Sequence, residues 1–301
     1  MSSDGPPWFA YDSDGQIVYG GVPDRLLHHP EIRRRGIRLT NAIKPGIVFR
    51  AGLDRPAFVV KVLNTNTEEI PIYDKLLSRI RSPLNHTVPS EIYRDGHPLL
   101  IMPNLHDLTG FLLSEERTPA RLFDIFYQLA ESLEYLHSLH IAHLDVCPDN
   151  FVGASPRDAE VHPAVAPRKV YLIDFDTSRQ LTLGPGAHSA ITLPPTQIRP
   201  PDGLKHFDPY SWDVYCLGHV FEDLMGTYPF DGKKRVPGIA RYVARWLIGK
   251  ERGCHAACRC RPTARTARQV LSVIRLLAPV LDFCERAYLV VWSWLPVNVH
   301  T

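Results

Sequence analysis

The pattern of apolar residues changes about a third of the way along the chain, and this change limits the folds that the sequence can adopt. In the first third, short apolar segments are separated by turns rich in proline and glycine, which predicts an antiparallel meander over residues 37–43, 47–51 and 57–63. Farther along, apolar residues recur at helical spacing over residues 119–138, directly after the start signal Thr118-Pro119. A strand-rich part followed by a helix-rich part is typical of the α+β class.

The remaining periodic segments complete this outline. We expect further helices over residues 67–77, 213–225 and 264–277, and further strands over residues 98–102, 151–152 and 169–173. The Pro- and Ala-rich stretch between the last two strands, residues 153–168, is predicted to be a surface insertion. We divide the chain into a weakly ordered N-terminal extension, a small strand-rich lobe, a helical lobe and an apolar C-terminal tail, which comprise residues 1–36, 37–105, 106–280 and 281–301.

Composition and charge exclude several classes of protein. The 301 residues are 45% hydrophobic and carry a formal net charge of +2, which is ordinary for a globular protein and gives no reason to expect nucleic acid as a partner. The first residues lack the basic and apolar parts of a secretory signal, so we expect a cytoplasmic or nuclear location and reduced cysteines. No apolar run reaches the roughly 20 residues that span a bilayer, and we therefore expect no transmembrane segment. The apolar residues 287–297 are expected to form a buried last helix or strand, with anchoring at a membrane surface as the alternative.

Polar residues that suit phosphate chemistry follow two of the apolar stretches. Asp145 and Asn150 share one loop, and Asp174 ends the next predicted strand. Carboxylate and amide oxygens of this kind are the ligands that Mg²⁺ uses when it bridges substrate phosphates, and one carboxylate remains to position a hydroxyl nucleophile. Turn carboxylates that only cap the backbone are the alternative interpretation. Lys61 is the single charge in an otherwise apolar strand, and Glu69 stands in the predicted helix that follows.

Two of these segments resemble motifs of the protein kinases. His143-Leu-Asp-Val-Cys-Pro-Asp-Asn150 resembles the catalytic loop H-R-D-x-x-x-x-N, and Asp174-Phe-Asp176 resembles the D-F-G element. Lys61, in Phe-Val-Val-Lys-Val, resembles the lysine of the V-A-I-K motif, and Glu69 stands where its glutamate partner lies, with Glu68 as the neighbouring alternative.

Further parts of the chain resemble kinase motifs in the same order. The segment Leu-Leu-Ile-Met-Pro-Asn-Leu resembles the strand that leads into the hinge between the lobes, with Met102 as the residue before the hinge. Later segments resemble the A-P-E motif, the start of helix F and the R-P-T-A motif, at Asp202, Asp213 and Arg261. The resemblance covers about residues 37–277.

The resemblance implies a bilobal protein kinase-like α+β fold, with a small antiparallel sheet and one helix in the N-lobe and a helical C-lobe. It also implies ATP and Mg²⁺ as cofactors and a protein as substrate or binding partner. The implied catalytic residues are Asp145, Lys61 and Asn150. The implied ATP-binding residues are Lys61, Glu69, Met102, Asn104 and Gly46, and the implied Mg²⁺ ligands are Asn150 and Asp174. The implied structural residues are His143, Asp202, Asp213 and Arg261. In the family, the arginine at the position of Arg261 pairs with the acid at the position of Asp202.

Four positions depart from the kinase pattern. No G-x-G-x-x-G precedes Lys61, and the turn at residues 44–46 has one glycine, so fewer backbone N–H groups can approach phosphates. Leu144 replaces the H-R-D arginine, Cys147 replaces the lysine of serine/threonine kinases, and Asp176 replaces the D-F-G glycine. The loss of the arginine predicts that control by phosphorylation of the activation segment is absent.

Three functions are consistent with these residues. The first is an atypical protein kinase that transfers the γ-phosphoryl group of ATP to a protein hydroxyl, with serine or threonine as the expected acceptor. The second is a pseudokinase that serves as a binding module, which the single-glycine turn and Asp176 favour. The third is a small-molecule phosphotransferase of the aminoglycoside or choline type, since the D-F-G glycine is often absent there. The helix-F and R-P-T-A segments favour the protein kinases over this third class.

Overall fold

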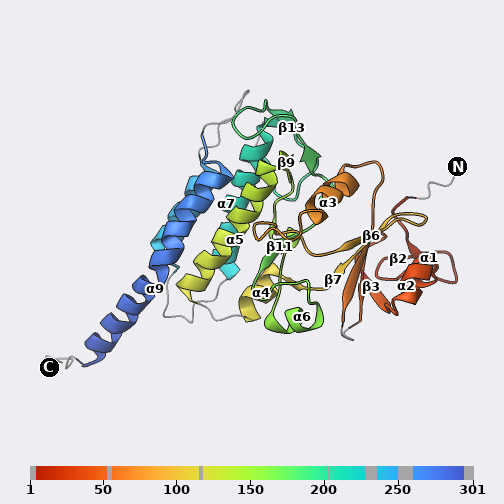
Figure 1. Cartoon of the computed structure of the whole chain (residues 1–301), viewed down its shortest axis with the longest axis horizontal. Coiled ribbons are helices and arrows are strands. Elements are labelled where there is room, and N and C mark those ends of the chain that lie inside the picture. Colours follow the sequence, from red (N-terminus) through yellow and green to blue (C-terminus); the bar gives the residue numbers. More distant parts are fainter. Residues whose placement is uncertain are drawn as a thin grey trace.

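The computed structural model describes residues 5–52, 56–114, 118–201, 204–227, 236–249 and 260–294, with side chains described as far as residue 280. Two lobes are visible in Figure 1: strands with a few short helices form one, and long helices form the other. The fold is therefore α+β and bilobal, as predicted.

A five-stranded antiparallel sheet forms the small lobe. Its strands in chain order are β3 (Leu39–Lys44), β4 (Val48–Ala51), β5 (Phe58–Val62), β6 (Glu91–Tyr93) and β7 (Leu99–Pro103). In space they follow the order β3-β4-β5-β7-β6, so that β5 pairs with β4 and β7. The predicted meander is confirmed. The sequence did not indicate β6, because three residues of mixed polarity show no period.

Helix α3 (Glu69–Leu77) is the helix predicted after β5. Its buried side chains include Ile72, Tyr73 and Leu76, which belong to the main hydrophobic core shared with the large lobe. The helix starts after Glu68, and the side chain of Thr67 accepts the otherwise free N–H of Glu69 at 3.4 Å. Glu69 therefore lies in the first turn, directly after the strand that carries Lys61.

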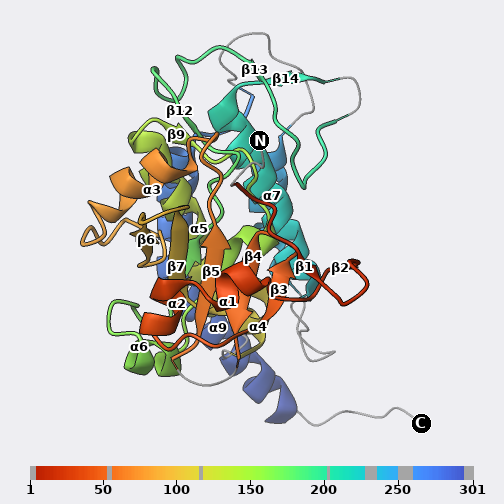
Figure 2. The ribbon, with the colours of Figure 1, turned by 90° about the vertical axis from the view of Figure 1, so that its right-hand side faces the viewer.

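The N-terminal residues correct one prediction. Residues 5–36, expected to be weakly ordered, contain the hairpin β1 (Ala10–Tyr11) and β2 (Ile17–Val18), followed by α1 (Asp24–Leu27) and α2 (Pro30–Arg34). Trp8, Leu26 and Ile32 are buried in a core with Phe49 and Val60 of the sheet. Figure 2 shows α1 and α2 in front of the strands. The segment is ordered because it covers an apolar face of the sheet that would otherwise meet water.

The large lobe is helical. Its helices are α4 (Leu108–Ser114), α5 (Pro119–Ser138), α7 (Pro209–Thr227), α8 (Gly238–Ile248) and α9 (Ala264–Trp294). Helix α5 begins as predicted, since Thr118 Oγ1 accepts the N–H of Arg121 at 3.2 Å, and α9 packs along it (Figure 1). Helix α9 continues to Trp294, so the tail boundary predicted at residue 281 falls inside a helix. Among the described residues, none of the helices combines the length and apolarity needed to cross a bilayer.

Short strands pack against the helices of the large lobe. The strands β8 (His106–Asp107), β10 (Phe151–Gly153) and β11 (Val170–Leu172) form a small antiparallel sheet, and α6 (Pro156–Val161) lies in the predicted insertion between the last two. Two further pairs are β9 (Ile141–Ala142) with β12 (Arg179–Gln180), and β13 (Ile191–Thr192) with β14 (His206–Phe207). This arrangement places the loop between β9 and β10 next to the residues that follow β11.

Candidate active site

Lys61, Glu69 and Asp174 meet where the two lobes join. Lys61 belongs to β5, and its Nζ donates to Glu69 Oε1 of α3 at 2.5 Å and to Asp174 Oδ1, beyond β11, at 2.6 Å. The Lys61 and Glu69 side chains are buried, whereas the Asp174 side chain keeps 23% of its surface exposed. The alternative partner Glu68 turns away, because its Oε2 accepts the N–H of Gln180 at 2.7 Å.

Lys61, Glu69 and Asp174 place two carboxylates around one buried ammonium, and the two carboxylates have different pKa values. Burial works against the charge on Lys61, but the carboxylates of Glu69 and Asp174 raise its pKa above the usual value. Burial raises the pKa of Glu69 to about 7, despite the attraction of Lys61. Burial also acts on Asp174, yet the Lys61 ammonium lowers the pKa of Asp174 overall. Asp174 is therefore ionised at neutral pH, as a cation ligand must be.

Asp145 and Asn150 lie on the loop between β9 and β10. Asn150 Nδ2 donates to the Asp145 carbonyl oxygen at 2.8 Å and to Asp145 Oδ2 at 3.2 Å, which fixes the carboxylate in place. The second carboxylate oxygen, Asp145 Oδ1, accepts the N–H of Gln197 at 2.8 Å. Gln197 lies in the segment between β13 and β14, so this segment contacts Asp145, the predicted catalytic aspartate, directly.

Asp213, which is fully buried in α7, holds the start of the same loop. Its two carboxylate oxygens accept the N–H groups of His143 and Leu144, each at 2.8 Å, and His137 Nε2 lies 2.9 Å from Oδ2. Leu144 has a φ of +68°, a backbone conformation that costs free energy for a residue other than glycine. Asp213 compensates this strain by binding the two N–H groups around it.

Aromatic rings in edge-to-face contact connect α3 to the loop that carries Asp145. Phe175 is buried between Tyr73 and His143, with ring centroids 5.0 and 5.3 Å away. His143 Nε2 donates to the Ile173 carbonyl oxygen at 3.0 Å, and its Nδ1 accepts the N–H of Asp145 at 3.3 Å. These contacts hold Asp174, whose φ is +61°, in the strained conformation that directs its carboxylate toward Lys61.

The side-chain oxygens of Asn150 and Asp174 are of the kind that binds Mg²⁺ together with phosphates. Asn150 uses its amide nitrogen on Asp145, and its amide oxygen accepts no hydrogen bond from any of the residues that the structure describes. Asp174 adds a carboxylate with a lowered pKa. The described residues form no cluster of three or more His, Cys, Asp or Glu that could hold a metal ion. One amide oxygen and one carboxylate make a small donor set, which is typical of a cation that keeps waters and substrate oxygens among its ligands.

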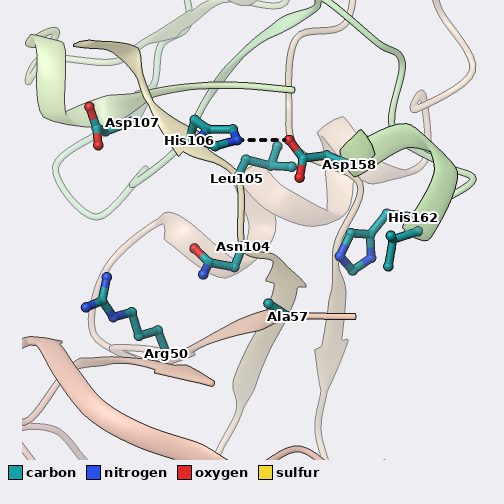
Figure 3. A pocket seen from close by; sticks show the side chains of 9 residues that line it. Arg50, Ala57, Asn104, Leu105, His106, Asp107, Asp158 and His162 are labelled. Carbon is teal, nitrogen blue, oxygen red and sulfur yellow. Dashed lines mark ion pairs between the residues drawn. The ribbon is translucent and has the colours of Figure 1, made fainter. Parts of the chain in front are cut away.

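The segment that connects the lobes carries two of the predicted ATP-binding residues. Met102, at the end of β7, is buried, and the N–H of Asn104 donates to the Ala57 carbonyl oxygen at 3.0 Å. Figure 3 shows Asn104 beside a cavity of about 280 Å³, in which His106 Nε2 lies 3.6 Å from Asp158 Oδ2 of α6. Lys61, Glu69 and Asp174, which meet at the lobe junction, are not among the residues that line this cavity.

The turn between β3 and β4 stands where the resemblance implies a glycine-rich loop. Gly46 has a φ of +73° and the N–H of Ile47 donates to the Lys44 carbonyl oxygen at 3.0 Å, which together with Pro45 is the pattern of a type II turn. Gly46 is buried under the N-terminal segment, where the N–H of Trp8 donates to the Gly46 carbonyl oxygen at 2.7 Å. A role for Gly46 in binding ATP stays a prediction.

The predicted pair of Asp202 and Arg261 also stays a prediction, because Asp202 lies outside the described residues. Arg261 is buried beside α7 and α8. Its Nε donates to the Ile248 carbonyl oxygen at 2.6 Å, and its guanidinium lies 4.9 Å from the centre of the Tyr215 ring.

The sequence did not indicate three of the residues at this site. Lys44 Nζ lies 3.8 Å from Asp174 Oδ2, although the sequence marks Lys44 only as part of a turn. Gln197 contacts Asp145 from a segment without periodicity, and no sequence signal could have identified it. Tyr73 could have been found, because it stands one helical turn after Glu69 and so lies on the same face of α3.

Comparison with curated proteins finds similarity to protein kinases. The chain is 26% identical over 246 residues to serine/threonine-protein kinase PknD of Chlamydia pneumoniae, a match that covers 76% of this chain and 24% of the relative. It is 30% identical over 110 residues to MAP kinase-activated protein kinase 2 of Oryctolagus cuniculus, which covers 35% of this chain and 26% of the relative. A probable cyclin-dependent serine/threonine-protein kinase of Dictyostelium discoideum is 26% identical over 211 residues, or 65% of this chain and 14% of the relative.

No family model matches the chain. The chain spans about a quarter of the length of the first two of these relatives. The two lobes and these matches identify a bilobal, protein kinase-like α+β fold, related to protein kinases at low identity.

Proposed function

We propose that this protein is an atypical protein kinase, which transfers the γ-phosphoryl group of ATP to a protein hydroxyl, with serine or threonine as acceptor. The observation that carries the proposal is a pair of side-chain groups, Lys61 with Glu69 and Asp174, and Asp145 with Asn150. The Ile173 N–H, next to Asp174, donates to the Asn150 carbonyl oxygen at 3.0 Å and so connects the two groups. The names of the similar proteins support this class, because each is a protein kinase. Protein substrates or partners follow from the same class.

The residues around the cofactor would divide the work of binding. Lys61 would hold the α- and β-phosphates, while Glu69 keeps the lysine in place. Asn150 and Asp174 would hold Mg²⁺ through their side-chain oxygens. Bound ATP with Mg²⁺ supplies the phosphoryl group and neutralises the charge that develops on it. Other contacts to ATP are proposed for Met102, Asn104 and Gly46.

Asp145 would act on the acceptor. Its carboxylate orients the acceptor hydroxyl and takes its proton, while the oxygen bonds to the γ-phosphorus and the bond to the β-phosphate oxygen breaks. The Gln197 N–H donates to Asp145 Oδ1 and the Gln197 Nε2 donates to Oδ2 at 3.4 Å, so the acceptor would compete with Gln197 for this carboxylate. Asn150 also holds Oδ2, so the carboxylate keeps its place during this exchange.

A pseudokinase that serves as a binding module is the second candidate. Two contacts favour it: Gln197 lies on the Asp145 carboxylate, and the turn at Gly46 is packed under Trp8. Both would reduce access for acceptor and phosphates. This candidate keeps the fold and assigns the lobe junction a structural role.

Transfer of label from γ-³²P-ATP to a general acceptor protein such as casein tests the proposal. The full chain with Mg²⁺ should label the acceptor, and Lys61→Met should lose this activity by a factor of about 100 or more, because one buried cation that contacts the phosphates is removed. The control is Arg33→Met, which removes one positive charge from an exposed position in α2. Wild-type protein that binds Mg·ATP without transferring phosphate would favour the pseudokinase.

A further inference from the structure

Lys44 and Lys61 lie on opposite oxygens of one carboxylate. Lys61 Nζ is 2.6 Å from Asp174 Oδ1, and Lys44 Nζ is 3.8 Å from Asp174 Oδ2. The two lysines differ in exposure, because the Lys61 side chain is 4% exposed and the Lys44 side chain is 51% exposed. Lys44 is therefore the more accessible of the two ammonium groups at the predicted position of the phosphates.

The turn that carries Lys44 offers few backbone donors to a phosphate. Pro45 has no N–H, and the N–H of Ile47 is already bonded to the Lys44 carbonyl oxygen. Gly46 contributes the remaining N–H of the turn, and the residue is buried. A glycine-rich loop binds phosphates through several such groups, so this turn needs another source of positive charge.

The N-terminal segment fixes the position of this turn. Besides the hydrogen bond from Trp8 to Gly46, a Cβ on Gly46 would lie 2.7 Å from Pro7 Cβ and 3.1 Å from the Phe9 ring. The Arg25 guanidinium lies 4.1 Å from the centre of the Trp8 ring and holds the segment from its other side. The backbone of Lys44 is therefore anchored, and only its side chain has to move toward a ligand.

Acidic side chains gather near the junction of the lobes. The four acids near the junction are Glu69, Asp145, Asp174 and Asp176. Asp176 stands where the kinase pattern has glycine, and its Oδ1 is buried without a hydrogen-bond partner among the described residues. Lys44 Nζ lies 3.8 Å from Asp174 Oδ2 and adds positive charge beside these acids, where a triphosphate would bring further negative charge.

We propose that Lys44 Nζ binds the phosphates of the nucleotide and replaces the backbone N–H groups of a glycine-rich loop. This inference rests on the proposed nucleotide site and adds a residue to it. Without nucleotide, Lys44 pairs with Asp174. When Asp174 binds Mg²⁺, the Lys44 ammonium turns from the carboxylate to the phosphate oxygens. Like the carboxylate, these oxygens are negatively charged hydrogen-bond acceptors.

Titration calorimetry with Mg·ATP and with adenosine tests this role in the full chain. We expect Lys44→Ala to weaken Mg·ATP binding about tenfold, which is the scale of one charge-assisted hydrogen bond, and to leave adenosine binding unchanged. Lys44→Arg keeps the charge and should retain most of the affinity. Lys205→Ala removes the same charge from an exposed position and should bind as the wild type does.

The outcomes separate the two proposals. If Lys44→Ala binds Mg·ATP as tightly as the wild type, or more tightly, the role of Lys44 is wrong and the nucleotide site stands. If Lys44→Ala weakens Mg·ATP and adenosine equally, Lys44 acts on the lobe as a whole, and the phosphate contact is wrong. If the wild type binds no Mg·ATP at millimolar concentration, the proposed nucleotide site fails, and the role of Lys44 fails with it.

Discussion

Asp145→Asn is expected to lower the rate of phosphoryl transfer by a factor of about 10² to 10⁴, the range that a positioned general base contributes. Asparagine keeps the size of the side chain and one oxygen for the Gln197 N–H, but it cannot take the proton of the acceptor hydroxyl. Binding of Mg·ATP should remain, because Asp145 is not among the proposed nucleotide contacts and Asn150 keeps its hydrogen bond to the backbone carbonyl oxygen of residue 145. Single-turnover labelling of a protein acceptor measures the rate, and calorimetry measures the binding.

The matched control is Asp149→Asn. Asp149 lies on the same loop and is exposed, so its replacement makes the same change in charge without touching the predicted base. It should transfer phosphate at the wild-type rate. Equal rates for Asp145→Asn and the wild type would show that Asp145 does not act on the acceptor.

Asp213→Ala is expected to lower the free energy of unfolding by about 3 to 5 kcal/mol, because it leaves buried N–H groups without an acceptor. The N–H groups of His143 and Leu144 each donate to Asp213 at 2.8 Å, and the carboxylate is fully buried. Leu144 would keep its strained φ without the contact that compensates it. A loss of this size is a large fraction of the stability of a typical domain. Urea unfolding followed by circular dichroism measures it.

Two further variants make this prediction specific. Asp213→Asn keeps one acceptor oxygen and should lose less stability than Asp213→Ala. Asp223→Ala changes an exposed acid on the same helix and should stay within about 0.5 kcal/mol of the wild type. If Asp213→Ala unfolds at the same urea concentration as Asp223→Ala, the Asp213 carboxylate does not hold the catalytic loop.

Much of the fold could be predicted, because strong periodicity and local start signals determine the long elements. Helix α5 begins and ends as its apolar stripe and Thr118 indicate, and β3, β4 and β5 follow the turns between them. The sequence did not predict that residues 5–36 are well ordered, because their structure depends on tertiary contacts with the sheet. The sequence of β5 did indicate that some segment covers the sheet, because its successive apolar residues lie on both of its faces. A strand of this kind is buried on both sides.

The core of the candidate site could be predicted for a different reason. The motifs around Lys61, Asp145 and Asp174 are local in sequence, and resemblance to a family supplies the long-range pairing that the sequence does not contain. The contact of Lys44 with Asp174 joins residues that lie far apart in the chain. The contact of Gln197 with Asp145 comes from an irregular segment. Neither contact follows a period or a motif, so only the structure could reveal them.

The central claim is that the junction of the lobes forms a Mg²⁺-dependent nucleotide site. The most direct test is the melting temperature of the full chain with increasing ATP, with and without Mg²⁺, for the wild type and Asp174→Ala. Ligand that binds only the folded state raises the melting temperature in proportion to the logarithm of its concentration above the dissociation constant. We predict a Mg²⁺-dependent rise for the wild type that Asp174→Ala loses. No rise at millimolar ATP, or an equal rise in the variant, would contradict the account.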